Sequence, residues 1–283
     1  ATKALGDNPA SQLRDWASLS SLSMNDQVQT EAYVNSGNNA NLLLQTAYSE
    51  WGVVGGPYST GDRYAHGKVL ATTETLQAAG PWGSNTGFNY KVWSNSALSK
   101  YFLRKIPYEF EYTDLQAGIG YAHSIFSAFN TDMLLMERAE AYALKGEYQK
   151  AVDDVNTELS VFSSRNVTLS VDGIKEYYKG IKYYTPKEPT VKKALHPAFT
   201  IDAETQEPVL QCILQLKRIL SMHEGLRMQD VKRYGIVIYR RTLNKNDEIL
   251  DVTDSLTVDD PRRAIQLPQD VINSGLEANP RTK

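Results

Sequence analysis

The chain has 283 residues, of which 41% are hydrophobic and 22% are charged, and its formal net charge is −3. This length allows one large domain or two ordinary ones, either with a substantial core. The near-neutral charge and the lack of an arginine-rich run argue against a nucleic-acid-binding protein, and no apolar run of about 18 residues suggests a membrane-spanning helix.

The first 120 residues are expected to be rich in loops. They contain 12 of the 18 glycines and all four tryptophans. Apolar residues at helical spacing predict a first helix from Asn39 to about Trp51. Two glycine-punctuated stretches follow, GVVGGPYSTGDRYAHG and AAGPWGSNTGFNY, and they predict turns and long loops. Loops of this length are functional or disordered in most proteins, and the aromatic content argues against disorder.

From Thr131 onward the pattern becomes helical. Two helices are predicted, Asp132 to Lys145 and Tyr148 to Leu159, with Gly146 as the cap between them. The core of this segment, AEAYALKGEYQKAVDDVN, resembles a tetratricopeptide repeat. About three such repeats are usually needed for stability, and one clear copy is visible. Its neighbours are therefore degenerate, outside this chain, or replaced by other helices.

A shorter helix is predicted from Val171 to Tyr184, and a proline-marked connection then leads to a long amphipathic helix from Val209 to Tyr234. Gly235 is expected to close that helix. The acidic segment from Asn244 to Asp260 predicts an exposed hairpin or loop, and a turn of helix is expected from Gln269 to Ser274.

The helix from Val209 to Tyr234 is expected to face the core along one stripe, which Glu224 and Arg227 interrupt. These two residues lie three apart and can pair within one turn, and Asp230 and Arg233 continue the alternating signs. An internal salt-bridge ladder that fixes the docking of the helix is the favoured interpretation, and an active site is the alternative. The stripe consists of Val209, Ile213, Leu216, Leu220, Glu224, Arg227, Val231 and Tyr234.

Three ordered motifs give the chain a family likeness. The segment from Ile213 to Gly235 resembles the helix near the C-terminal end of SusD/RagB-like outer-membrane lipoproteins of Bacteroidetes, in which EG-x-R-x-x-D-x-x-R-(aromatic)-G follows a basic run. The family also has an AEAY helix upstream, seen here at Ala139 to Tyr142, and a tail of the form DPR…LP…NP. That tail is matched by Asp260-Pro261-Arg262, Leu267-Pro268 and Asn279-Pro280.

The resemblance implies that the protein captures glycans at the cell surface and delivers them to a SusC-like TonB-dependent transporter, without catalysis or a cofactor. It also implies peripheral attachment to the outer membrane through a lipid anchor. Family members begin with a lipid-bearing cysteine and are longer, whereas this chain begins Ala1-Thr2-Lys3. We expect it to be the C-terminal portion of such a protein or a short relative.

Glycan recognition requires flat aromatic rings for the apolar faces of sugars and planar polar groups for their hydroxyls. The loop-rich region supplies both, although the same rings can instead pack a subdomain that has few aliphatic residues. Trp82 is the first choice because glycines flank it. The candidate ligand-binding residues are Trp51, Tyr58, Asp62, Tyr64, Trp82, Asn85, Tyr90 and Trp93.

Catalytic and metal sites are weakly supported. Glu109 and Glu111 are two apart and would share one face of a strand, whereas a glycosidase needs two carboxylates across a cleft. The four histidines lack zinc-site spacing, and the single cysteine, Cys212, lies in an apolar helix. The chain is therefore not expected to be an enzyme or to hold a metal.

The predicted fold is mainly α, with a tetratricopeptide-like helical scaffold and a loop-rich aromatic subdomain. Residues 1–125 are expected to form the loop-rich subdomain with the ligand-binding aromatics, and residues 126–283 the SusD-like helical region. The alternative function is a helical-hairpin scaffold or a peptide-binding protein of the same surface-uptake type.

Overall fold

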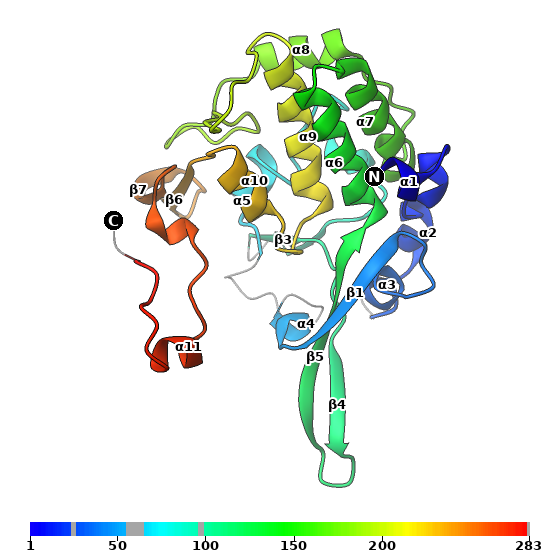
Figure 1. Ribbon diagram of the computed structural model, residues 1–283, viewed down its shortest axis with the longest axis vertical. Coiled ribbons are helices and arrows are strands. Elements are labelled where there is room, and N and C mark those ends of the chain that lie inside the picture. The colour runs from blue at the N-terminus through cyan, green and yellow to red at the C-terminus, as the bar shows by residue number, and fades with distance from the viewer. Residues whose placement is uncertain (24–26, 55–64, 96–98, 282–283) are drawn as a thin grey trace.

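The computed structural model describes residues 1–23, 27–54, 65–95 and 99–281. A helical body occupies one end of the molecule, and a long β-hairpin projects away from it (Figure 1). The principal helices are α1 (Thr2–Leu5), α2 (Trp16–Ser21), α3 (Val28–Tyr33), α4 (Trp51–Val54), α5 (Lys68–Thr73), α6 (Thr131–Leu144), α7 (Tyr148–Phe162), α8 (Val171–Lys179), α9 (Gln206–Leu220), α10 (Arg227–Arg233) and α11 (Gln269–Asn273). The strands are β1 (Asn41–Tyr48), β2 (Trp93–Asn95), β3 (Lys100–Phe102), β4 (Glu109–Asp114), β5 (Ile119–Asn130), β6 (Ile238–Leu243) and β7 (Ile249–Leu256).

The fold is mixed α/β, so the prediction of a mainly α, tetratricopeptide-like scaffold is wrong. The described part of the chain is 38% helical and 19% strand, and its strands form three antiparallel sheets. The largest sheet has the order β1-β5-β4, and β2-β3 and β6-β7 are two-stranded. The prediction relied on the helical pattern of the second half. That pattern does not indicate which distant segments of the first half pair as strands.

Strand β1 replaces the helix predicted from Asn39 to Trp51. It pairs antiparallel with β5, so that Leu44 lies opposite Ser127 and Tyr48 opposite His123. The apolar residues of this segment fit both helical and strand periodicities. The partner decides between them, because β5 satisfies the backbone groups of β1, most of whose side chains remain exposed.

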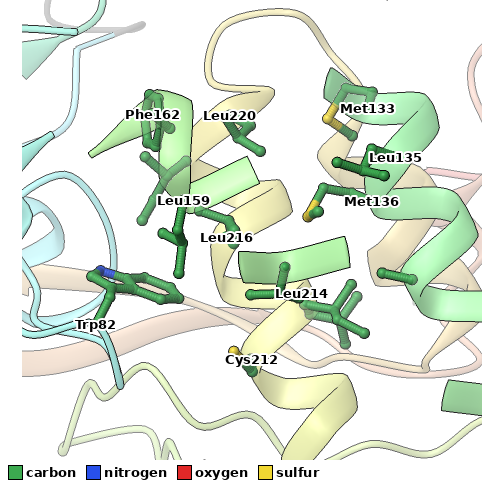
Figure 2. Close-up of a cluster of buried hydrophobic side chains, with 14 of the residues drawn as sticks. Trp82, Met133, Leu135, Met136, Leu159, Phe162, Cys212, Leu214, Leu216 and Leu220 are labelled. Carbon is green, nitrogen blue, oxygen red and sulfur yellow. The ribbon is translucent and has the colours of Figure 1, made fainter. Parts of the chain in front are cut away.

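The helical pair α6 and α7 confirms the two helices predicted after Thr131. The Asn130 side chain caps α6 by accepting a hydrogen bond from the Met133 amide at 2.8 Å. Gly146 follows the C-cap residue Lys145 in the left-handed conformation, with a φ of 78°. Helix α9 packs against both helices of the pair, and Figure 2 shows their side chains meeting in the core.

One core cluster includes residues from both predicted regions. Leu13, Trp16 and Trp82 from the first region belong to the same buried cluster as Leu135 and Leu216. The boundary placed at residues 125 and 126 lies within β5. The N-terminal segment is therefore packed onto the helices of the second region.

The long helix predicted from Val209 to Tyr234 is broken into α9 and α10. Between them His223 and Gly225 adopt positive φ angles of 66° and 78°, which a helix cannot contain. The expected pairing of Glu224 with Arg227 is also wrong. The Glu224 carboxylate instead contacts Lys105 Nζ at 3.1 Å and accepts a hydrogen bond from the Tyr33 hydroxyl at 2.6 Å.

The charges of the second half converge on the Lys217 ammonium, a group we call the Lys217 hub. Lys217 Nζ lies 2.8 Å from Glu140 Oε2, 2.8 Å from Asp230 Oδ1 and 2.7 Å from Glu137 Oε1. Glu140 in turn accepts a hydrogen bond from the Tyr234 hydroxyl at 2.7 Å. Burial opposes the charge of Lys217, but the surrounding carboxylates prevail and raise its pKa. The hub joins α6, α9 and α10.

The C-terminal segment closes against the end of α10. The segment expected to form a hairpin or loop, Asn244 to Asp260, supplies the turn and the second strand of the hairpin β6–β7, whose first strand lies before it, and α11 confirms the expected helical turn. The Arg263 guanidinium donates to the carbonyl groups of Val231 at 2.8 Å and Ile236 at 2.6 Å. Within the described residues, no helix is long and apolar enough to cross a membrane.

Replacing Lys217 with Met should lower the free energy of unfolding by about 3 to 5 kcal/mol, because it leaves buried carboxylates without their shared counter-charge. Equilibrium urea denaturation measures this change. The matched control is Lys150→Met, which removes a lysine from an exposed pair with Glu147 and should change stability by less than about 1 kcal/mol. Equal effects of the two variants would contradict the role of the hub.

Candidate functional site

The break between α9 and α10 forms one wall of a cavity of about 710 Å³. This volume lies in the range of small-ligand sites. The opposite walls come from the residue after β1, the start of α4, α5 with the segment before it, and β5. The lining residues are Ser49, Trp51, Ala65, His66, Leu70, Phe126, Arg218, Ser221, Met222, His223, Glu224, Gly225 and Arg227.

The apolar part of the cavity contains Trp51, Leu70, Phe126 and Met222. Trp51 begins the short helix α4, and its backbone amide donates to Ser49 Oγ at 3.1 Å. Helix α4 lies close to the chain before β4, since a Cβ on Gly52 would overlap the carbonyl group of Pro107. Only glycine permits this approach, which holds the half-buried Trp51 at the cavity.

The charged part of the cavity contains two guanidinium groups and one carboxylate. Arg218 Nη1 lies 3.2 Å from Glu74 Oε2, and Arg227 Nη1 lies 3.3 Å from Asp230 Oδ2. Burial and the neighbouring Arg218 lower the pKa of Arg227 to about 10, so that it stays charged at neutral pH. Cations and an aromatic wall therefore face the same space.

Two histidines complete the wall, and their ring centroids are 6.1 Å apart. His66 is held by a backbone bridge to Tyr101, and its Nδ1 lies 2.8 Å from Thr75 Oγ1. Burial, with the positive charge of Arg218, lowers the pKa of His66 to about 3. Burial, with the charge of Lys105, lowers the pKa of His223 to about 4. Both rings are consequently neutral at pH 7.

Three of the predicted ligand-binding residues are buried in the core, so their assignment to a binding surface is wrong. Trp82 is only 5% exposed and lies among the core side chains in Figure 2. Gly80 and Gly83 pair across a tight turn, which folds the indole inward, and its Nε1 donates to Asn85 Oδ1 at 2.8 Å. Asn85 is buried by this contact. Tyr90 is buried beside Trp16, and its hydroxyl donates to the Arg104 carbonyl.

The other predicted residues are divided between the cavity and other places. Trp93 is half-buried and packs on Phe102 with the ring centroids 4.7 Å apart, outside the cavity lining. Tyr58, Asp62 and Tyr64 lie outside the described residues. Of the candidates that the structure describes, Trp51 is the one that lines the cavity.

Several cavity residues were not among the predicted ligand-binding residues, notably His66, Phe126, Arg218 and His223. One signal for the location was available in the sequence. Glu224 and Arg227 interrupt the core-facing stripe of the predicted helix, and both line the cavity. Phe126 and His66 carried no such signal because they come from distant segments.

The carboxylate of the cavity and the candidate carboxylate pair lie in different places. Glu224 is the carboxylate among its lining residues, and both of its oxygens are engaged, by Tyr33 and by Lys105. The candidate pair Glu109 and Glu111 lies on β4, where Glu111 Oε2 is 3.0 Å from His123 Nε2. Among the described residues no group of three His, Cys, Asp or Glu side chains is arranged to hold a metal ion.

No protein-family model matches the chain, and neither the curated proteins nor the solved structures include a match. The resemblance to SusD/RagB-like proteins therefore rests on the three motifs. Two of these motifs contact each other. Glu140 of AEAY binds Lys217, Arg233 and Tyr234, which belong to the segment from Ile213 to Gly235. Glu224 and Arg227 of the same run line the cavity.

The lowered histidine pKa values predict a loss of stability in mild acid. Unfolded histidine binds a proton near pH 6.5, whereas His223 in the folded chain binds one only near pH 4. The unfolded state therefore binds more protons between these values, and stability is complete above pH 6.5 and falls as the pH decreases toward 4.

Substituting His223→Asn should reduce this loss by on the order of 1 kcal/mol between pH 7 and pH 4.5. Asparagine removes the titrating group and tolerates the positive φ at this position. Urea denaturation across the pH range measures the effect. The control His196→Asn changes an exposed histidine and should leave the pH dependence of the wild type in place. An unchanged pH dependence in His223→Asn would contradict the assignment.

Proposed function

We propose that this chain is a non-catalytic, glycan-binding protein that holds an oligosaccharide for a SusC-like TonB-dependent transporter. The observation that carries the proposal is the cavity at the α9–α10 break, where Trp51 and Phe126 lie in one lining with Arg218, Arg227 and Glu224. The three family motifs agree with it.

The mixed lining suits the two-sided chemistry of sugars. A sugar ring has apolar C–H faces that pack on aromatic side chains, and its hydroxyl edges need hydrogen-bond donors and acceptors. The apolar wall supplies the first surface. Guanidinium groups supply rigid planar donors, and the two neutral imidazole rings add polar edges without further charge.

The contribution of each ring is modest, about 0.5 to 1.5 kcal/mol beyond the area that it buries. We therefore expect weak binding of monosaccharides and tighter binding of oligosaccharides that reach several groups. Uptake by a transporter requires release, so a weak site is compatible with delivery.

The transporter partner, the location at the outer membrane surface and attachment through a lipid anchor follow from the family resemblance and are part of the same proposal. An exposed aromatic surface on the β1-β5-β4 sheet is compatible with contact to a protein partner. Its exposed residues include Tyr48, Tyr112, Ile119 and Tyr121.

The same surface favours a peptide as the second candidate ligand. Both β1 and β4 are edge strands of the three-stranded sheet, and an extended peptide can add a strand to such an edge. In that case the exposed rings would contact peptide side chains, and the cavity would not be the primary site.

The proposal predicts that the chain binds at least one oligosaccharide from a broad panel and that Trp51→Ala weakens this binding roughly three- to tenfold. Isothermal titration calorimetry or affinity electrophoresis measures the change. The matched control is Trp93→Ala, which removes a half-buried indole outside the cavity lining. Melting temperatures of both variants establish that they are folded.

Two results would contradict the proposal. The first is binding of peptides by a chain that binds no glycan. The second is equal loss of glycan binding in Trp51→Ala and Trp93→Ala, which would place the site elsewhere.

A further inference from the structure

The charged groups around the cavity are unequally exposed. The side chains of Arg218 and Arg227 keep 18% and 24% of their surface accessible, whereas those of their partners Glu74 and Asp230 keep 3% and 6%. Both arginines belong to the cavity lining, whereas Glu74 and Asp230 do not. A ligand in the cavity therefore lies beside the arginines and not beside their carboxylate partners.

The carboxylates behind this wall are shared. Glu74 contacts Lys193 at 2.6 Å, Arg218 at 3.2 Å and Arg241 at 3.4 Å. Asp230 is divided between Arg227 and Lys217, which also contacts Glu137 and Glu140. Arg218 and Arg241 thus share one carboxylate, and each guanidinium is less fully neutralised than in an exclusive pair.

Hydrogen-bond capacity remains on this wall. The hydrogen bonds that Arg218 and Arg227 make within the described residues use Nη1, and each guanidinium has further N–H groups in its plane. Such a planar fork matches the two oxygens of a carboxylate. His223 Nε2 is also buried and has no hydrogen-bond partner among the described residues.

Glu224 does not cancel this positive field. Its side chain keeps only 5% of its surface accessible, one oxygen accepts the Tyr33 hydroxyl, and the other contacts Lys105. Glu224 is therefore held by its own partners, and the arginines are the charged groups of the lining whose carboxylate partners lie outside it.

We infer that the ligand of this cavity is an acidic sugar, with its carboxylate at Arg218 and Arg227 and its ring against Trp51. The inference rests on the proposed function, since it names the class of glycan that the same site accepts. It also predicts weaker binding of neutral sugars. Binding removes water from the two guanidinium groups, and hydroxyl groups replace those hydrogen bonds less well than a carboxylate does.

Matched ligands test the inference directly. Oligogalacturonate, oligomannuronate and oligosialate are each titrated into the full chain by calorimetry, beside the same oligosaccharide with its carboxyl groups reduced to alcohols. At least one acidic member should bind, and its reduced counterpart should bind at least tenfold more weakly. Equal affinity for the two members of each bound pair would overturn the inference while leaving the proposed function in place.

Arginine variants locate the effect. Arg218→Lys and Arg227→Lys keep the charge that faces Glu74 and Asp230 but lose the planar fork, so each should weaken binding of the acidic oligosaccharide at least fivefold. The control is Arg262→Lys, an arginine with the same 24% accessibility and its own carboxylate partners, outside the cavity. It should bind like the wild type.

The outcomes separate the two proposals. Binding of neutral glycans alone, with loss in Trp51→Ala, would support glycan binding and overturn the preference for an acidic sugar. No binding of any neutral or acidic oligosaccharide would overturn both. Acidic-sugar binding that is equally strong in Arg218→Lys, Arg227→Lys and Arg262→Lys would overturn the assignment of the two arginines.

Discussion

The structure depends on where the Lys217 ammonium is held. A buried ammonium is costly unless carboxylates surround it, and Glu137, Glu140 and Asp230 do so from α6 and α10. This requirement fixes the distance and rotation of α9 relative to both helices. Arg233 and Tyr234 then bind the second oxygen of Glu140, so that the end of α10 is held as well. The Lys217 hub specifies how the helices pack as well as stabilising them, because few other arrangements of α6, α9 and α10 would pair every charge.

The cavity follows from this constraint. Because both helices are held by the hub, the short chain between Leu220 and Arg227 must turn back within a fixed span. It does so through the positive φ angles of His223 and Gly225. The turn places Ser221, His223 and Glu224 in the cavity lining. Glu224 reaches back to Lys105 and Tyr33, which ties the turn to the N-terminal half of the chain.

The opposite wall is held by different means. Gly52 lets α4 approach Pro107 closely, and Ser124 Oγ on β5 accepts a hydrogen bond from the Gly52 amide at 3.1 Å. Trp51 is thereby presented to the turn by the sheet, while the arginines are presented by the helices. The aromatic and the guanidinium groups of the cavity thus come from two parts of one core. Glu74 and Asp230, which lie outside the lining, accept hydrogen bonds from Nη1 of the two arginines.

The sequence by itself determined the local features of this protein. The helices from Asp132 to Leu159, the turn at Gly146, the hairpin in the acidic segment and the unusual charges within the Val209 to Tyr234 run all follow from periodicity, caps and short-range spacing. Only the tertiary structure decided the partners. Asn41 to Tyr48 is a strand because β5 lies beside it, and Trp82 is buried because its turn closes against the helical core. The charge partners of Glu224 and Arg233 also differ from their helical neighbours, and Asp230 pairs with the distant Lys217 as well as with its neighbour Arg227. The physical reason is the same in each case: backbone pairing, burial and ion pairing are contacts between residues far apart in the chain, and local spacing does not specify which distant residue will be there.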